Sequence, residues 1–407
     1  MQQNTYANNY FKFLISVCIF SYLFCYASTI SLSPSSDDGV FLSVYNTGDI
    51  FQFLVKNFKT WSGRFSIELI MTSTIGIEWF WRIGIPASVI LTGYSISKIV
   101  FHKSSILLIG MFVFIFSQIP SAILGDSAWW VTGFYNYLLP TSIALYLFST
   151  LQLVNINKAE KIACIALSFY VSYMEQVALC LLVAIVVMLL INKNSRTRYR
   201  YFVLAIIAIN FIACVKSPGN VSRLSIETLN WMPGYKYFNI LDMISLGWDK
   251  LYQIITLKYN IPFSIFCISL LYASSKTSPI NFSLKFSMIV ISSFPALMIY
   301  HSLCGGIFFE GNLIDSGNYS LIDIYISYFY VLVLSVSILL VLIDMLLSGL
   351  SSPLPIFSFL ISYMSVVIMG FSPTVYASGF RVYYVFEILC ILNSMYFLVN
   401  SVKKQAE

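Results

Sequence analysis

Long apolar runs, each close to the length of a membrane-spanning helix, recur from one end of this chain to the other. A spanning α-helix needs about 20 predominantly apolar residues, because the hydrocarbon core offers its backbone no hydrogen-bond partners. Twelve runs meet this description, near residues 11–32, 79–101, 104–124, 134–154, 161–174, 176–192, 200–216, 259–274, 284–303, 321–347, 353–371 and 382–402. They predict an all-α polytopic membrane protein in which residues 1–407 form a single transmembrane domain.

Composition excludes a water-soluble domain. Of the 407 residues, 58% are hydrophobic and only 10% are charged, whereas about a quarter of the residues in soluble domains are charged. The first run has the full length of a spanning helix and lacks the small-residue cleavage site of a signal peptide, so we expect it to be retained. Seven of the eight cysteines fall within apolar runs, and the two histidines, His102 and His301, stand apart. Neither a disulfide framework nor a zinc site is predicted.

The basic residues predict the orientation of the chain. Lysine and arginine are retained on the cytoplasmic side of membrane proteins, and the clearest basic block is NKNSRTRYR, residues 192–200. With twelve spans and this bias, both termini are predicted to be cytoplasmic. The net charge of +6 is therefore a topology signal, and no nucleic-acid partner is predicted.

This orientation gathers the unusual polar residues on the outer face. The first outer loop, residues 33–78, begins with Asp37 and Asp38 and includes a stretch, 41–60, that can form an amphipathic helix lying on the membrane. A long outer loop is predicted for residues 217–258, with Pro218-Gly219-Asn220 as a turn, and a tight turn is predicted at 173–176. The inner loops carry little beyond positive charge, so chemistry is expected on the outer face.

A set of short motifs on that face carries a family resemblance. In chain order they read DDGVFL, WSGRF, WWVTGFYNYLLP, MEQ, SPGNVSR and SPTVYASGFRVYY, from residue 37 to residue 384. In their order and common side they resemble the GT-C-type polytopic membrane glycosyltransferases of bacterial envelopes. Within that class the chain most resembles the serotype-converting O-antigen glucosyltransferases of enteric bacteria and their phages.

The resemblance implies a multi-pass protein of the bacterial inner membrane that works on its periplasmic side. It implies a polyprenyl-phosphate sugar as donor, such as undecaprenyl-phosphate glucose, and a lipid-linked polysaccharide, the O-antigen or a relative, as acceptor. It further implies an acidic catalytic base in the first outer loop and an inverting displacement. The motif positions fall on Asp37, Asp38, Arg64, Asn136, Glu175, Asn220, Arg223 and Arg381.

The residue types suit this chemistry. A base must take the proton of the acceptor hydroxyl, and cations must hold the departing phosphate, because charge develops on both oxygens in the transition state. Either Asp37 or Asp38 can be the base, and guanidinium groups bind phosphate oxygens in a bidentate fork. The predicted phosphate-binding residues are Arg64, Arg223 and Arg381; the predicted substrate-binding residues are Asp126, Trp130, Tyr135, Asn136, Glu175 and Asn220. The first loop contains no Asp-x-Asp or Glu-x-Asp triplet, so no cofactor is assigned and a divalent cation stays open.

Each candidate also has a simpler interpretation. The arginines can anchor helix ends at the lipid headgroups, and the aromatic residues around Trp130 can form an interfacial belt instead of stacking on sugars. Glu175 is costly near the membrane, so it either acts in the site or pairs with one of the arginines.

Two other functions stay open. An O-antigen polymerase also has about a dozen helices and outer-face arginines, but it is expected to centre on a large arginine-bearing outer loop. A transporter or flippase is expected to line a path through the membrane midplane with charges, whereas most ionisable residues here are predicted near one face.

Overall fold

The computed structural model describes residues 2–275, 282–314 and 320–406. These residues form helices joined by turns, with no strand among them, so the all-α prediction is confirmed. Within the described part of the chain two compact units can be separated. Unit 1 comprises Met1–Phe114, Ala122–Pro233 and Gly379–Tyr384, and unit 2 comprises Ile115–Ser121, Gly234–Ser378 and Val385–Glu407.

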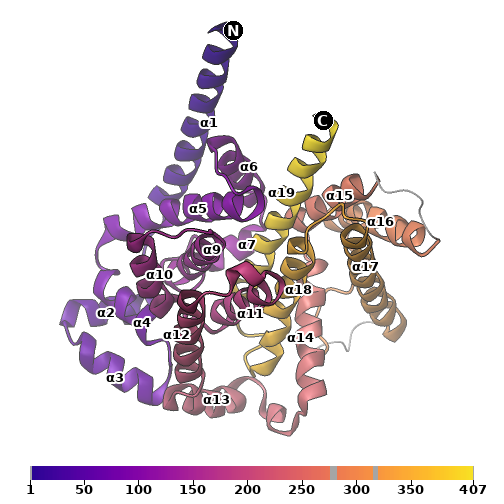
Figure 1. Cartoon of the computed structure of the whole chain (residues 1–407). Coiled ribbons are helices and arrows are strands. Elements are labelled where there is room, and N and C mark those ends of the chain that lie inside the picture. The colour runs from indigo at the N-terminus through magenta and orange to yellow at the C-terminus, as the bar shows by residue number, and fades with distance from the viewer. Residues whose placement is uncertain (1, 276–281, 315–319, 407) are drawn as a thin grey trace. The chain divides into compact units, whose positions relative to one another are not determined.

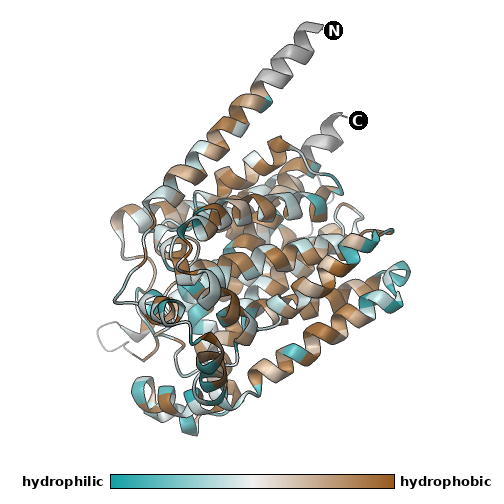
Figure 2. Cartoon of the chain, turned by 90° about the vertical axis from the view of Figure 1, so that its left-hand side faces the viewer, coloured by the Kyte–Doolittle hydropathy of each residue, from teal (hydrophilic) through white to brown (hydrophobic). Residues whose placement is uncertain are grey.

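Among the described residues, seven helices are long and apolar enough to cross a membrane. They are Phe11–Thr29, Glu78–Phe101, Arg198–Val215, Phe282–Cys304, Ile322–Leu347, Leu354–Phe371 and Arg381–Asn400. Each coincides with one of the twelve predicted runs. Hydrophobic residues cover most of the long helices, and hydrophilic residues gather at helix ends and in connecting segments (Figure 2). The chain is therefore a polytopic membrane protein.

The other five predicted runs form shorter or divided helices. The run at 104–124 is split into α6 (Ile106–Phe116) and α7 (Ser121–Asp126), with Pro120 between them. The run at 134–154 begins with a π-helical turn, Phe134–Leu138, before α9 (Leu139–Leu151). Helices α10 (Lys158–Val171), α11 (Glu175–Ile191) and α15 (Ile261–Ser274) have 14, 17 and 14 residues. All are shorter than the roughly 20 residues that cross a bilayer core unaided.

Unit 1 is a helical bundle with a layer of short helices at one end (Figure 1). Its remaining elements are α1 (Gln2–Thr29), α2 (Asp37–Thr47), α3 (Ile50–Thr60), α4 (Phe65–Thr74), α5 (Glu78–Phe101), α8 (Val131–Gly133), α12 (Arg198–Val215) and α13 (Pro218–Trp231). Helix α5 packs against α1 and α9, and α10 packs against α9 and α12. Helices α2, α3 and α13 lie at the end of the unit away from the N-terminus of α1 (Figure 1).

Unit 2 contains α15 and four other complete helices. These are α14 (Ile240–Ile255), α16 (Phe282–Cys304), α17 (Leu321–Leu347) and α18 (Leu354–Val367), followed after the 368–384 segment by most of α19 (Tyr384–Ala406). Helix α16 packs against α15 and α17. Helix α14 crosses the end of α18 at two glycines: a Cβ on Gly247 would lie 2.0 Å from the carbonyl oxygen of Val367, and one on Gly370 would lie 1.9 Å from that of Met243.

The predicted outer loops are largely helical. The stretch at 41–60 forms parts of two helices instead of one, because Gly48 adopts a φ of 76° and ends α2. Such a left-handed cap is a common way for a helix to stop. The predicted turn at Pro218-Gly219-Asn220 is wrong: these residues are the first turn of α13, where Pro218 needs no N–H and Ser217 Oγ accepts from the Asn220 N–H at 3.2 Å. The tight turn before Glu175 is confirmed.

The basic block at 192–200 also closes helix ends. The Arg196 guanidinium donates to the carbonyls of Leu189 and Leu190 at 2.9 and 3.1 Å. Arg200, buried in unit 1, donates to the carbonyls of Leu151 and Leu153 at 2.7 Å each. Because the last carbonyls of a helix lack intrahelical partners, these two arginines stabilise the ends of α11 and α9 as well as adding positive charge.

Two glycines let the end of α3 and the segment after it contact the backbone at the end of α12 and the start of α13. A Cβ on Gly63 would lie 2.3 Å from the carbonyl oxygen of Cys214, and one on Gly219 would lie 2.6 Å from the Ser62 nitrogen. Real Cβ atoms do not approach backbone so closely. The WSGR and SPGN segments, 157 residues apart, therefore need glycine where they meet.

We predict that Gly219→Ala lowers the free energy of unfolding by about 1–3 kcal/mol, the usual cost of overpacking a close contact. Thermal unfolding of the purified protein in one detergent checks this. Gly125→Ala is the matched control, since nothing lies within 4 Å of the added methyl group, and it should leave the midpoint unchanged or slightly higher. A Gly219→Ala protein as stable as the wild type would contradict the contact.

Candidate functional site

The centre of the candidate site is an ion pair between residues far apart in the sequence. Arg64 precedes α4, and Glu175 is the first residue of α11. Arg64 Nε donates to Glu175 Oε2 at 2.9 Å, and Nη2 lies 2.9 Å from the same oxygen. The two side chains are only 21% and 26% exposed. The predicted pairing of Glu175 with an arginine is confirmed.

Asn136 supports the same guanidinium from another segment. Its Oδ1 accepts from Arg64 Nη1 at 3.2 Å, and its Nδ2 donates to the Thr132 carbonyl at 2.9 Å. Asn136 lies in the π-helical turn before α9, and Pro140, which has no N–H to offer the Asn136 carbonyl, follows it. Such wide turns often occur at functional sites.

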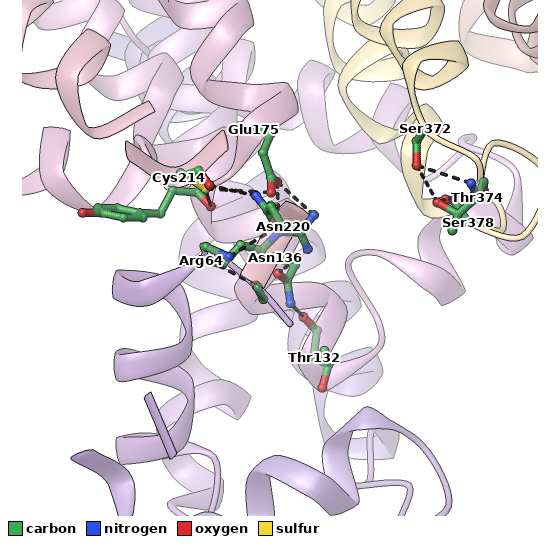
Figure 3. Close-up of polar contacts among 12 residues, drawn as sticks. Arg64, Thr132, Asn136, Glu175, Cys214, Asn220, Ser372, Thr374 and Ser378 are labelled. Atoms are coloured by element: carbon green, nitrogen blue, oxygen red, sulfur yellow. Dashed lines mark hydrogen bonds and ion pairs between the residues drawn. The ribbon is translucent and has the colours of Figure 1, made fainter. Parts of the chain in front are cut away.

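Asn220 closes the site from α13. Its Oδ1 accepts from the Gly63 N–H at 3.3 Å, and its Nδ2 donates to the Cys214 carbonyl at 2.8 Å. Figure 3 shows Arg64, Asn136, Glu175 and Asn220 converging, with Cys214 alongside. The Cys214 thiol lies 3.8 Å from Glu175 Oε1. Four of the predicted site residues therefore come together, and each holds another part of unit 1.

Arg223 adds a second guanidinium to the cluster. It lies one turn along α13 from Asn220, is half-buried, and makes no hydrogen bond or ion pair with any residue that the structure describes. Burial lowers its pKa, as does the adjacent Arg64, and Glu175 and Glu227 oppose this shift. An arginine nevertheless stays protonated, so unit 1 holds a partly buried cation whose donors are not used by the protein.

The electrostatics of Arg64 differ because it is paired. Burial on its own would lower the pKa of Arg64, but Glu175 outweighs burial and raises it, with help from Tyr137 and Cys214. Arg64 is thus fixed by the charge and hydrogen bonds of Glu175, whereas Arg223 makes no hydrogen bond or ion pair with a described residue.

The two adjacent aspartates have different environments. Asp38 is fully buried: its Oδ1 accepts from the Thr132 N–H at 2.9 Å and hydroxyl at 2.6 Å, and its Oδ2 accepts from the Ser33 N–H at 3.0 Å. Asp37 is exposed in the first turn of α2, with no described partner. Successive helical residues point about 100° apart, so one carboxylate faces the bundle and the other faces solvent.

A second group of predicted residues lies around the segment before Thr132. The Arg381 guanidinium stacks on the Trp130 ring, with 5.6 Å between its carbon and the ring centroid. Asp126 Oδ2 accepts from the Phe380 N–H at 3.0 Å, and Gly379, with a φ of 66°, lets the backbone turn there. Asp126 therefore positions the segment that carries Arg381. The backbone also approaches closely at Gly133, where an added Cβ would lie 2.5 Å from the Ser127 carbonyl oxygen.

Tyr135 packs inside unit 1 instead of facing a ligand. It is 0% exposed, its hydroxyl lies 2.8 Å from Thr74 Oγ1, and its ring stacks on Phe80. The sequence could not place it, because the π-helical turn changes which residues of WWVTGFYNYLLP face inward.

Two further residues at the site, Glu68 and Asn57, were not predicted. Glu68, one helical turn after Arg64, is 5% exposed and accepts from Asn57 Nδ2 at 2.8 Å. Burial raises the pKa of Glu68, and hydrogen bonds from Asn57 and Ser62 and the charge of Arg64 oppose that rise. The Arg-x-x-x-Glu spacing was the available signal, because residues four apart share a helix face.

Among the described residues, no group of three or more His, Cys, Asp or Glu has the arrangement of a metal site.

Comparison with family models, curated proteins and solved structures found no match to this chain.

We predict that Glu175→Gln destabilises unit 1 by about 1–3 kcal/mol, because it leaves a mostly buried guanidinium without its counter-ion. The matched control is Glu78→Gln, which breaks the Arg82–Glu78 pair, where the glutamate is 64% exposed. Exposed pairs contribute about 0–1 kcal/mol. Denaturant or thermal unfolding of both variants in one detergent gives the comparison. Equal losses of stability would show that the Arg64–Glu175 pair contributes no more than an exposed pair.

Proposed function

We propose that this chain is a membrane glycosyltransferase that moves a sugar, with glucose as the best candidate, from a polyprenyl phosphate to the O-antigen or a related surface polysaccharide. The reaction takes place at the periplasmic face of the bacterial inner membrane. The observation that carries the proposal is the half-buried Arg223, which lies beside the Arg64–Glu175 pair and makes no hydrogen bond or ion pair with a described residue. A donor lipid phosphate supplies the anion that such a site lacks, and the motif resemblance supports this donor.

The arginines suit the leaving group. The sugar–phosphate bond breaks toward the phosphate oxygen, and the negative charge that develops there is stabilised by cations already oriented in a partly desolvated site. Arg223 offers five N–H donors that the described protein does not use, and Arg64 is held in one orientation by Glu175 and Asn136. Binding thus needs little rearrangement of Arg64.

We assign the base role to Asp37. It takes the proton of the acceptor hydroxyl as that oxygen bonds to the anomeric carbon, and polyprenyl phosphate departs with the electrons of the broken bond. A single displacement of this kind inverts the anomeric centre. Asp38 is a positioning residue, because both of its oxygens are occupied by hydrogen bonds from Ser33 and Thr132.

The topology that accompanies this proposal has twelve spans and both termini in the cytoplasm. The short helices α2, α3 and α13 lie at the end of unit 1 away from the N-terminus of α1 (Figure 1), which agrees with a cytoplasmic N-terminus and a periplasmic site. Helices of 14 to 17 residues cross only where neighbouring helices cover their ends or the bilayer thins.

The test is the chemical structure of the host surface polysaccharide, by mass spectrometry and NMR, with the gene present, deleted or altered. Asp37→Asn removes the proposed base and should abolish the sugar addition, with normal membrane insertion. Asp49→Asn is the matched control: Asp49 is also an exposed aspartate at a helix N-terminus, one helix further on, without a side-chain cap bond. Asp38→Asn should lose stability as well as activity, since its new amide would oppose an N–H donor.

The outcomes separate the candidate functions. Loss of one branch sugar on deletion and in Asp37→Asn, at unchanged chain length, supports the transferase. Collapse of the chains to a single repeat unit on deletion identifies a polymerase. Full activity of Asp37→Asn refutes the assigned base, and a polysaccharide that never changes refutes the transferase and leads to transport assays.

A further inference from the structure

A carboxyl group without a partner lies inside unit 2. Glu387 is on α19, within the span Arg381–Asn400, and is 0% exposed. Neither of its carboxylate oxygens has a hydrogen-bond partner among the described residues. An ionised carboxylate in such a place is very unfavourable, because neither water nor a counter-ion compensates for its lost hydration.

The surroundings of Glu387 offer no positive charge. The only side chain that acts on it among the described residues is the amide of Asn260. The nearby titratable groups are neutral thiols, Cys390 on α19 and Cys267 on α15. The Tyr363 hydroxyl on α18, which acts on these thiols, already lies 2.9 Å from Ser335 Oγ. No lysine, arginine or histidine is among the described groups that act on this carboxyl.

Asn260, which precedes α15, is a neutral neighbour of Glu387. Its Nδ2 donates one N–H to the Ile254 carbonyl at 2.8 Å, and its Oδ1 accepts from the Phe263 N–H at 3.2 Å, which caps α15. The nitrogen keeps a second N–H and the oxygen a second lone pair. A neutral amide does not supply the counter-ion that a buried carboxylate needs.

We propose that Glu387 is a proton-binding site in the membrane-spanning part of unit 2, where α19 packs against α15. The adjoining contacts between these helices are aromatic: Phe263 and Phe386 lie 5.7 Å apart, and Phe266 and Phe397 lie 6.5 Å apart, between ring centroids. Release of the proton would place a charge beside these rings and loosen the packing of α15 on α19.

A proton bound at Glu387 makes the stability of the fold depend on pH. In the unfolded chain glutamate ionises above about pH 4.3, so at neutral pH folding takes up one proton from solvent. Stability is therefore greatest at low pH and falls as the pH rises, by up to about tenfold in the folded-to-unfolded ratio per pH unit, until the folded carboxyl itself ionises.

The experiment uses the full-length protein in lipid nanodiscs and two readouts, wild type against Glu387→Gln. Infrared spectra at pH 7 should contain the carbonyl band of a protonated carboxylic acid in the wild type and lack it in Glu387→Gln. Between pH 6 and 9 the thermal midpoint of the wild type should fall, and that of Glu387→Gln should fall less, because glutamine does not titrate. Glu78→Gln, at an exposed glutamate, should keep the wild-type slope.

Two results would overturn the proposal. One is a wild-type spectrum without any protonated-carboxyl band at pH 7, which decides the matter even if Glu387→Gln does not fold. The other is an equal pH slope in the wild type and in Glu387→Gln.

Discussion

The ion pair between Arg64 and Glu175 is the contact on which the candidate site depends. It joins the first outer segment to the start of α11, 111 residues further along the chain. A guanidinium that is only 21% exposed needs a counter-ion, and a carboxylate at the start of an apolar helix needs a cation. Each satisfies the other, and the pair also fixes where Asn136 and the loop before α13 can lie.

A chain of hydrogen bonds extends from this pair to the predicted acidic segment. Asn136 contacts both Arg64 and the Thr132 carbonyl, and the Thr132 N–H and hydroxyl bind Asp38. The base we assign, Asp37, is therefore attached through its neighbour to the same network that orients Arg64. Arg223 stands beside that network without using it. The site thus combines a hydrogen-bonded framework with one exposed acid and one arginine that makes no hydrogen bond or ion pair with a described residue.

Part of this arrangement could be read from the sequence. The order and common side of WSGRF, MEQ and SPGNVSR led us to group Arg64, Glu175 and Asn220, and the structure brings these residues together. Seven long spans were likewise predictable, because their apolar runs are uninterrupted. These features depend on hydropathy and on residue type, which a single sequence displays directly.

Other features depend on local geometry that hydropathy does not encode. The different environments of Asp37 and Asp38 follow from a helix that starts at Asp37 with Ser36 as its cap, whereas a solvated turn would have exposed both. The inward position of Tyr135 follows from a π-helical turn. The sequence did not mark Glu387 as a candidate, because a single acid in YYVFEILC does not interrupt an apolar run. Its burial without a hydrogen-bond partner among the described residues is what identifies it.

The most direct test of the central claim is the affinity of the purified protein for a polyprenyl phosphate, measured in nanodiscs of uncharged lipid. Arg223→Ala should weaken binding roughly 10–100-fold, the loss expected when charged hydrogen bonds to phosphate are removed. Arg198→Ala, at an exposed arginine at the start of α12, should bind like the wild type. Equal affinity of the wild type and Arg223→Ala would contradict a lipid-phosphate site built on these arginines.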